Sequence, residues 1–139
     1  MRRFIAVAVL LGFCQGCQPN PNKVELVVAD GFRGTVIIKS DNLNGVVLKK
    51  VDGRYVVSIP KDGVLAIKGY DPFRSYLSTA RFANGESIWV STQIDDRPPK
   101  GRICLFGGYT QIRGDSSGHQ ESDFRYFVGT EEEWKASTD

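Results

Sequence analysis

Thiol and imidazole groups, which serve as nucleophiles, bases and metal ligands, are few in this sequence of 139 residues: it has three cysteines and one histidine. Cys14 and Cys17 stand close together near the amino end, whereas Cys104 and His119 lie in the second half. A thiol can accept an acyl group, form a disulfide or bind a metal. The residues around each thiol indicate which of these reactions is available to it.

The segment around the first two cysteines has the pattern of an export signal. Arg2 and Arg3 form a basic start, an uninterrupted apolar run covers residues 4–13, and Cys14-Gln15-Gly16-Cys17 follows. A helix that spans a bilayer needs about 20 apolar residues. The run at 4–13 is too short for that, so it predicts a cleaved signal rather than a permanent anchor.

The same segment resembles the signal of bacterial lipoproteins, in which a small residue precedes an acceptor cysteine. Gly16 and Cys17 provide that pair, and Cys14 stands three positions before the acceptor, where Leu is usual. The resemblance implies lipidation of Cys17, for example with palmitate, and attachment to the cell membrane or the outer membrane. The alternative is ordinary cleavage near Gly16, which leaves Cys17 as a plain thiol on a periplasmic or secreted protein.

Residues 1–17 are therefore predicted to be the signal with its lipidation cysteine, and residues 18–22 a spacer. The spacer, Gln-Pro-Asn-Pro-Asn, is polar, and its two prolines discourage a helix and keep the chain extended. We expect it to let a single domain, 23–139, stand clear of a bilayer. With Cys17 lipidated, Cys104 has no intramolecular partner, and residues 102–106 predict a strand that buries its thiol.

The segment around His119 is where an acid–base or cation site could be built, since Asp115, Glu121 and Asp123 are close in sequence. These acids lack the regular spacing of a calcium loop. Cys104 and His119 are too few for a tetrahedral metal site, and Gly-x-Ser-x-Gly is absent. We predict no metal, no cofactor and no enzymatic activity. A hydrolase with a site near His119 is the less favoured alternative.

Aromatic and arginine side chains gather in residues 69–85, whose irregular pattern predicts a long connection. Tyr70, Arg74, Tyr76 and Arg81 have the composition of protein-interface anchors. We predict that they bind a ligand or partner. The competing interpretation is that the aromatic rings pack over the open edge of the fold.

Charge argues against nucleic acid as a partner. The formal net charge of +2 falls to zero once Arg2 and Arg3 leave with the signal. The remaining basic residues are scattered, and Lys49-Lys50 is the one adjacent pair among them. A nucleic-acid-binding stripe needs clustered basic residues, so none is predicted.

The elements that position these residues are predicted to be mostly strands. Residues 46–51 and 54–59 flank Asp52-Gly53, which favours a type I′ hairpin turn. Residues 60–63 form a second turn before 64–68, so we expect three consecutive antiparallel strands in a meander. Further strands are expected at 23–29, 35–39, 87–94, 102–106 and 123–128.

The face of 54–59 that carries Tyr55, Val57 and Ile59 is apolar and must be covered. Without a long amphipathic helix, a second sheet is the simplest cover. We therefore predict a mainly β fold, an antiparallel β-sandwich of transthyretin-like or immunoglobulin-like type with a short C-terminal α-helix. A capping box from Thr130 to Glu133 starts that helix, and Trp134 is expected to dock it.

Two stretches, residues 28–36 (VADGFRGTV) and 127–134 (FVGTEEEW), together resemble an uncharacterised family of bacterial exported proteins. That family has no assigned activity, so the resemblance implies export without catalytic residues. Residues 52–63 are similar to transthyretin-like or carboxypeptidase-regulatory-like sandwiches, which are accessory modules. Together these features predict a non-catalytic binding or structural module at the cell envelope, with an unknown protein or envelope ligand as partner.

Overall fold

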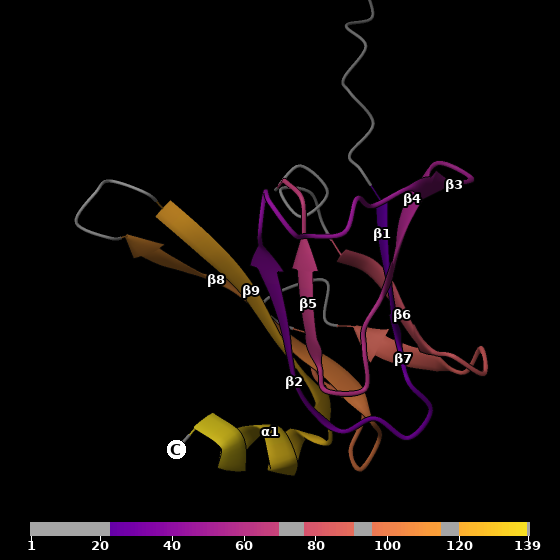
Figure 1. Cartoon of the computed structure of the whole chain (residues 1–139). Coiled ribbons are helices and arrows are strands. Elements are labelled where there is room, and N and C mark those ends of the chain that lie inside the picture. The colour runs from indigo at the N-terminus through magenta and orange to yellow at the C-terminus, as the bar shows by residue number, and fades with distance from the viewer. Residues whose placement is uncertain (1–22, 70–76, 91–95, 115–119, 139) are drawn as a thin grey trace, which may run out of the picture.

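A computed structural model describes residues 23–69, 77–90, 96–114 and 120–138. Within these ranges the chain forms nine strands and one helix (Figure 1). They are β1 (Lys23–Val28), β2 (Gly34–Ser40), β3 (Lys50–Val51), β4 (Arg54–Ser58), β5 (Val64–Ile67), β6 (Leu77–Phe82), β7 (Ser87–Val90), β8 (Cys104–Gly114), β9 (Gln120–Gly129) and α1 (Glu131–Thr138).

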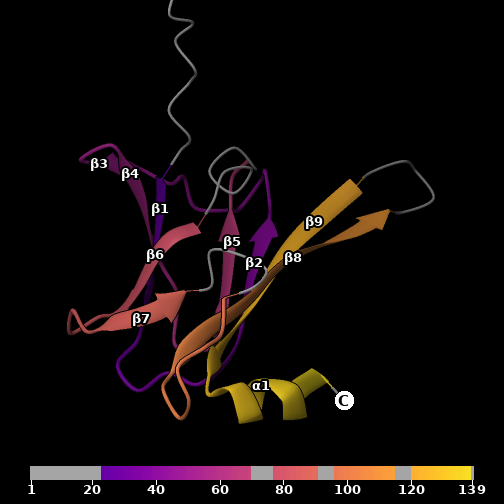
Figure 2. The same cartoon turned by 180° about the vertical axis from the view of Figure 1, so that it is seen from behind.

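The strands form one continuous sheet in the order β3-β4-β1-β6-β7-β8-β9-β2-β5, which curls into a half-barrel (Figures 1 and 2). β1 lies between β4 and β6 and is parallel to both. β2 lies between β5, to which it is parallel, and β9, to which it is antiparallel. A short parallel pairing of β7 with β8 joins the two halves of the sheet.

The prediction of a mainly β fold with a short C-terminal helix is confirmed. The predicted antiparallel β-sandwich is not what forms, because the two halves belong to one curled sheet. Four of the eight pairings between described strands are also parallel. Parallel neighbours arise where a strand finds its partner far along the chain instead of across a hairpin.

The predicted meander is wrong for this reason. The Asp52-Gly53 turn forms, with φ of 49° and 77° at its two residues, and it pairs β3 with β4. The next turn, however, carries the chain away from β4 to the other half of the sheet. The Ile59 amide donates to Val27 O in β1, whereas Gly63 O accepts from the Ile37 amide in β2.

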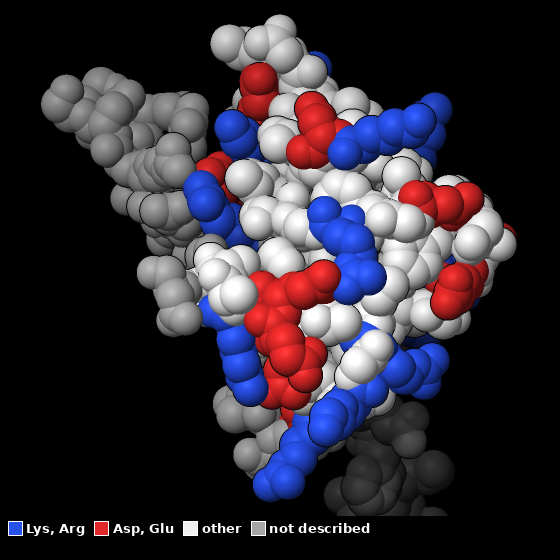
Figure 3. Space-filling model, turned by 90° about the horizontal axis from the view of Figure 1, so that it is seen from below, with Lys and Arg blue, Asp and Glu red and all other residues white. Residues whose placement is uncertain are grey.

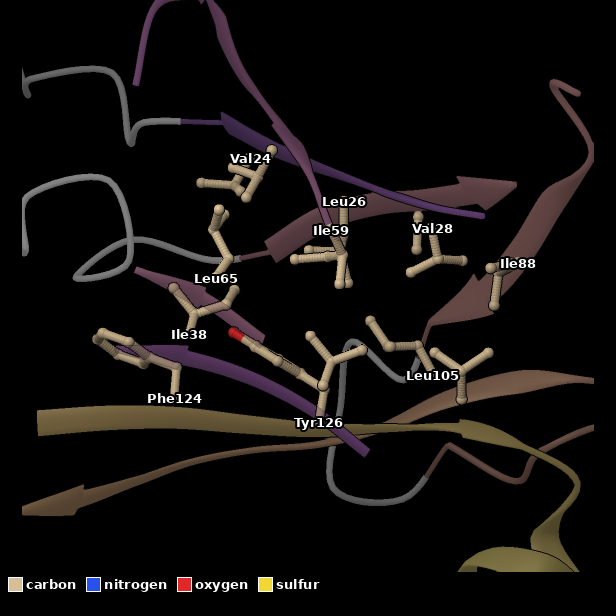
Figure 4. Close-up of a cluster of buried hydrophobic side chains, with 14 of the residues drawn as sticks. Val24, Leu26, Val28, Ile38, Ile59, Leu65, Ile88, Leu105, Phe124 and Tyr126 are labelled. Atoms are coloured by element: carbon tan, nitrogen blue, oxygen red, sulfur yellow. The ribbon is translucent and has the colours of Figure 1, made fainter. Parts of the chain in front are cut away.

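The hydrophobic core fills the space between the two halves of the sheet (Figure 4). Of the apolar face predicted for residues 54–59, Val57 and Ile59 are buried and Tyr55 packs against the core. The buried members of the core all come from residues 24–128, after the spacer. They are Val24, Leu26, Val28, Val36, Ile38, Val57, Ile59, Leu65, Ile67, Ala80, Phe82, Ile88, Leu105, Phe124, Tyr126 and Val128.

The helix α1 begins at the predicted capping box. The Glu133 amide donates to Thr130 Oγ1 (3.3 Å), and the Thr130 amide donates to Glu133 Oε2 (2.8 Å). The Trp134 ring stacks on the Phe106 ring of β8, with 4.7 Å between centroids and 6° between planes. The docking role predicted for Trp134 is therefore confirmed, although its side chain is only half-buried.

Other boundaries differ from the sequence-based expectation. The predicted long connection at 69–85 contains β6. β8 is longer than the predicted strand 102–106, because it continues to Gly114 through an irregularity in register between Gly107 and Tyr109. β9 likewise extends beyond 123–128 at both ends.

Candidate functional site

Most of the predicted functional residues lie outside the described part of the chain. This holds for the proposed acyl acceptor Cys17, for Tyr70, Arg74 and Tyr76, and for His119. Their predicted roles stay predictions.

Arg81, the fourth predicted binding residue, lies on β6 and is engaged within the sheet. Its Nε donates to Glu25 Oε1 on β1 at 3.0 Å, and its Nη1 donates to the Phe82 carbonyl at 3.3 Å. Two-thirds of the Arg81 side chain is buried. The Arg81 guanidinium therefore helps to hold β1 beside β6.

Asp123 and Cys104, which belong to the proposed acid–base and thiol groups, also make contacts within the fold. Asp123 is buried on β9, where one carboxylate oxygen lies 3.7 Å from Arg125 Nη2. Cys104 is fully buried, and its thiol donates to the Arg102 carbonyl at 3.5 Å. Burial raises the pKa of the Cys104 thiol. It is therefore neutral near pH 7 and acts as a packing residue.

The described residues also lack two other features that would indicate a function. They contain no group of three or more His, Cys, Asp or Glu side chains placed to hold a metal ion. Among them, too, no helix is both long and apolar enough to cross a membrane.

The most exposed apolar surface of the described chain lies on the segment between β2 and β4. This segment links the two edges of the curled sheet. At one end Val46 bridges to Ile67 of β5, with hydrogen bonds from the Val46 amide to Ala66 O and from the Lys68 amide to Val46 O, both 2.9 Å. At the other end Lys50 pairs with Tyr55 of β4.

A tight turn fixes the start of this segment. Asp41 Oδ1 accepts hydrogen bonds from the Leu43 and Asn44 amides, both at 2.9 Å, and these bonds lower the pKa of Asp41. Gly45 is packed so closely that a Cβ there would lie 2.4 Å from both the Asp41 carbonyl oxygen and the Ile67 carbonyl carbon. The turn leaves Leu43 85% exposed.

A groove of about 340 Å³ runs beside the segment, between it and the strands β4 and β5. Most of its lining is aliphatic. It consists of Val46, Val47, Leu48, Lys49, Val51, Val56, Ser58 and Leu65. Val46, Val47 and Val51 are each more than half exposed, so the rim of the groove presents apolar surface to solvent.

Basic side chains border this apolar surface. A second hollow, of about 210 Å³, is lined by Lys23, Val24, Arg54 and Thr79. It adjoins the first because Val51 pairs with Arg54 across the hairpin. Lys49, Lys50, Lys23 and Arg54 are all exposed, and Lys50 Nζ lies 5.1 Å from the centroid of the Tyr55 ring.

We use the name entry-end patch for a set of exposed residues that are apolar or basic. The apolar members are Leu43, Val46, Val47 and Val51, and the basic members are Lys23, Lys49, Lys50 and Arg54. They lie at the end of the molecule where β1 begins and β2 and β5 finish (Figures 1 and 2). The helix α1 lies at the opposite end. Seen from that opposite end, the surface carries both acidic and basic side chains (Figure 3).

The sequence-based interpretation missed this patch because it assigned 46–51 to a strand. In the structure only Lys50 and Val51 belong to a strand, and Val46 makes a single bridge. One signal was available: Val46, Val47 and Leu48 are three consecutive apolar residues followed by two lysines. That run lacks the alternation of a strand with one solvated face.

Comparison with known proteins gave one structural similarity. No family model matches the sequence. No curated protein matches it either. Among solved structures the chain is similar to one described as a "Putative Lipoprotein from Bacillus anthracis", with 14% sequence identity and a TM-score of 0.49. The similarity covers 80% of this chain and 74% of that chain.

Proposed function

We propose that the chain is an exported lipoprotein, anchored by lipid on Cys17, whose domain is a non-catalytic binding or structural module of the cell envelope. The observation that carries the proposal is the signal-like pattern of residues 1–17, in which a basic start and an apolar run precede Gly16-Cys17. β1 begins at Lys23, directly after the spacer 18–22, and Lys23 belongs to the entry-end patch. Six residue steps separate Cys17 from Lys23, a reach of at most about 22 Å. A lipid on Cys17 would therefore keep this end of the domain close to a bilayer.

The state of Cys104 supports a module without thiol chemistry. Its thiol is buried and its pKa is raised, so it offers neither a nucleophile nor an accessible disulfide partner. The resemblances to the exported family and to transthyretin-like modules belong to this proposal as well. They supply no catalytic residues.

The lipidation is tested by labelled-palmitate incorporation in cells, with Cys17→Ser as the matched control. We expect label in the parent only, and a processed protein whose amino-terminal mass fits an acylated Cys17. In denaturant the processed parent should then show one titratable thiol, that of Cys104. Two titratable thiols on a shortened chain would indicate the secreted or periplasmic alternative, and a full-length, unacylated protein would contradict export.

The partner-binding part of the proposal rests on Tyr70, Arg74 and Tyr76, with Arg81 nearby in sequence. The Arg74→Ala and Tyr76→Ala variants should fold normally and lose capture of the partner from an envelope extract. Because Arg81 is bonded to Glu25, we expect Arg81→Ala to affect stability as well, so it is a poor test of binding. Unchanged capture by Arg74→Ala and Tyr76→Ala would remove these residues from the proposal.

A further inference from the structure

We propose that the entry-end patch docks directly onto the anionic phospholipid headgroups of the bilayer, so that the domain lies against the membrane. The inference rests on the proposed function, because a lipid on Cys17 supplies the nearby bilayer. It adds a second contact made by the folded domain itself.

The apolar half of the patch suits the interfacial region of a bilayer. Leu43, Val46, Val47 and Val51 are 53–85% exposed and all come from one short segment. Transfer of these aliphatic side chains from water to the boundary between headgroups and acyl chains is favourable in free energy. The bonded turn at Asp41 and the bridge between Val46 and Ile67 hold the segment in place, so little ordering is needed on contact.

The basic half of the patch indicates which surface it meets. Lys23, Lys49, Lys50 and Arg54 surround the apolar residues, and Lys68 is exposed next to the bridge at Val46. Within residues 41–54 the acidic residues are Asp41 and Asp52, so the positive charges in and beside the patch outnumber the negative ones. Each basic residue near an anionic membrane surface contributes to binding, and salt weakens that contribution.

The charge distribution also argues against a second copy of the chain as the occupant. The processed chain has a formal net charge of zero, so an excess of positive charge in the patch leaves an excess of negative charge elsewhere. Two patches placed face to face would bring Lys49 and Lys50 of one copy against the same lysines of the other. An anionic bilayer attracts the patch and repels the remainder of the domain.

The path of the chain gives the same orientation. Lys23 is both the first residue of β1 and a member of the patch, and its partner across the parallel pairing is Arg54. A chain held by lipid at Cys17 therefore enters the fold within the patch. α1, at the far end, then points away from the membrane (Figure 1).

The test uses the processed protein as recovered from cells, with an environment-sensitive fluorophore on Val47→Cys. Lys61→Cys is the matched control, because Lys61 is exposed in the turn at the opposite end of β4 from Arg54. Buried Cys104 should stay unlabelled, and the parent chain checks this. The protein is reconstituted with vesicles of phosphatidylethanolamine and phosphatidylglycerol, or of phosphatidylcholine alone.

We expect the fluorophore at position 47 to shift to the blue and to resist iodide quenching in the phosphatidylglycerol vesicles, and the one at position 61 to do neither. In Lys49→Gln/Lys50→Gln the ratio of docked to undocked protein should fall roughly thirtyfold, which is about 1 kcal/mol per basic residue. Lys61→Gln/Lys100→Gln removes the same charge from exposed sites away from the patch and should leave the ratio unchanged.

Failure of the inference and failure of the proposed function give different results. A lipidated protein with equal emission at positions 47 and 61 in both vesicle types would overturn docking and leave the anchor intact. An unlipidated protein that still binds phosphatidylglycerol vesicles through position 47 would support docking and overturn the anchor. Protection of position 47 without vesicles, increasing with protein concentration, would identify a second copy as the occupant and overturn docking.

Discussion

Arg33 and Glu133 form an ion pair although they lie 100 residues apart in the sequence, with Arg33 Nε donating to Glu133 Oε2 at 3.1 Å. Arg33 lies in the connection between β1 and β2, and Glu133 lies in the first turn of α1. The same carboxylate oxygen accepts the Thr130 amide. One carboxylate therefore caps the helix and ties it to the far end of the sequence.

This arrangement predicts a stability change in acid. The hydrogen bond from Arg33, followed by that from Thr130, holds the pKa of Glu133 below 4.5. Its contribution to stability is present above the ordinary pKa and is lost as the pH falls through the lowered folded-state value. The free energy of unfolding, measured in urea, should therefore fall less from pH 7 to pH 3 in Glu133→Gln than in the parent. An equal loss in both proteins would show that the ion pair does not affect folding.

The stack of Phe106 on Trp134 predicts a measurable coupling between β8 and α1. Aromatic pairs of this geometry contribute about 1 kcal/mol beyond the area they bury. A double-mutant cycle with Phe106→Leu and Trp134→Leu should give a coupling free energy of about that size in chemical denaturation. Additive effects of the two substitutions would contradict a role for the stack in docking the helix.

Two glycines with the same backbone conformation offer a matched comparison. Gly63 and Gly53 have φ of 79° and 77°, but a Cβ on Gly63 would lie 2.5 Å from Thr35 O, whereas one on Gly53 would meet nothing within 4 Å. We expect Gly53→Ala to cost about 1 kcal/mol of unfolding free energy from the backbone alone. Gly63→Ala should cost about 2 kcal/mol more, because β2 and the turn must move apart. Similar costs would mean that the chain near Gly63 relaxes freely.

The buried Tyr126 predicts a loss of stability in base. Burial raises the pKa of its hydroxyl from 10.0 to about 12. Because the pKa of Tyr126 is higher in the folded than in the unfolded protein, its contribution to stability is complete below pH 10. That contribution is lost as the pH rises from 10 toward 12. Between pH 9 and pH 11 the parent should lose about 1 kcal/mol of unfolding free energy that Tyr126→Phe retains. Parallel stability curves for the two proteins would contradict burial of the ionisable hydroxyl.

Features set by neighbours in the sequence were predictable. The Asp52-Gly53 turn and the capping box at Thr130 depend on backbone preferences over a few residues, and both form as expected. The choice of strand partners was not predictable in the same way. Alternating side chains show that a strand has a buried face, but they do not say that β1 lies between β4 and β6.

The same limit applies to the candidate site. Arginine is a residue type common at binding interfaces, which favoured a binding role for Arg81. Its partner Glu25, however, is 56 positions away in the sequence, and only the sheet brings the two together. The exposure of Val46 and Val47 likewise depends on the curling of the sheet, which leaves its two edges to be linked by one segment. Residue types alone predict an anchor at the amino end, but they could not predict the entry-end patch.

The pairing of β2 with β9 determines when this molecule can finish folding. Gly34 lies opposite Val128, so one long edge of β2 has no neighbour until nearly all of the polypeptide has been synthesised. Contacts between such distant segments form slowly, because a long loop must close first. A nascent chain of this topology therefore cannot complete its sheet before β9 has been synthesised.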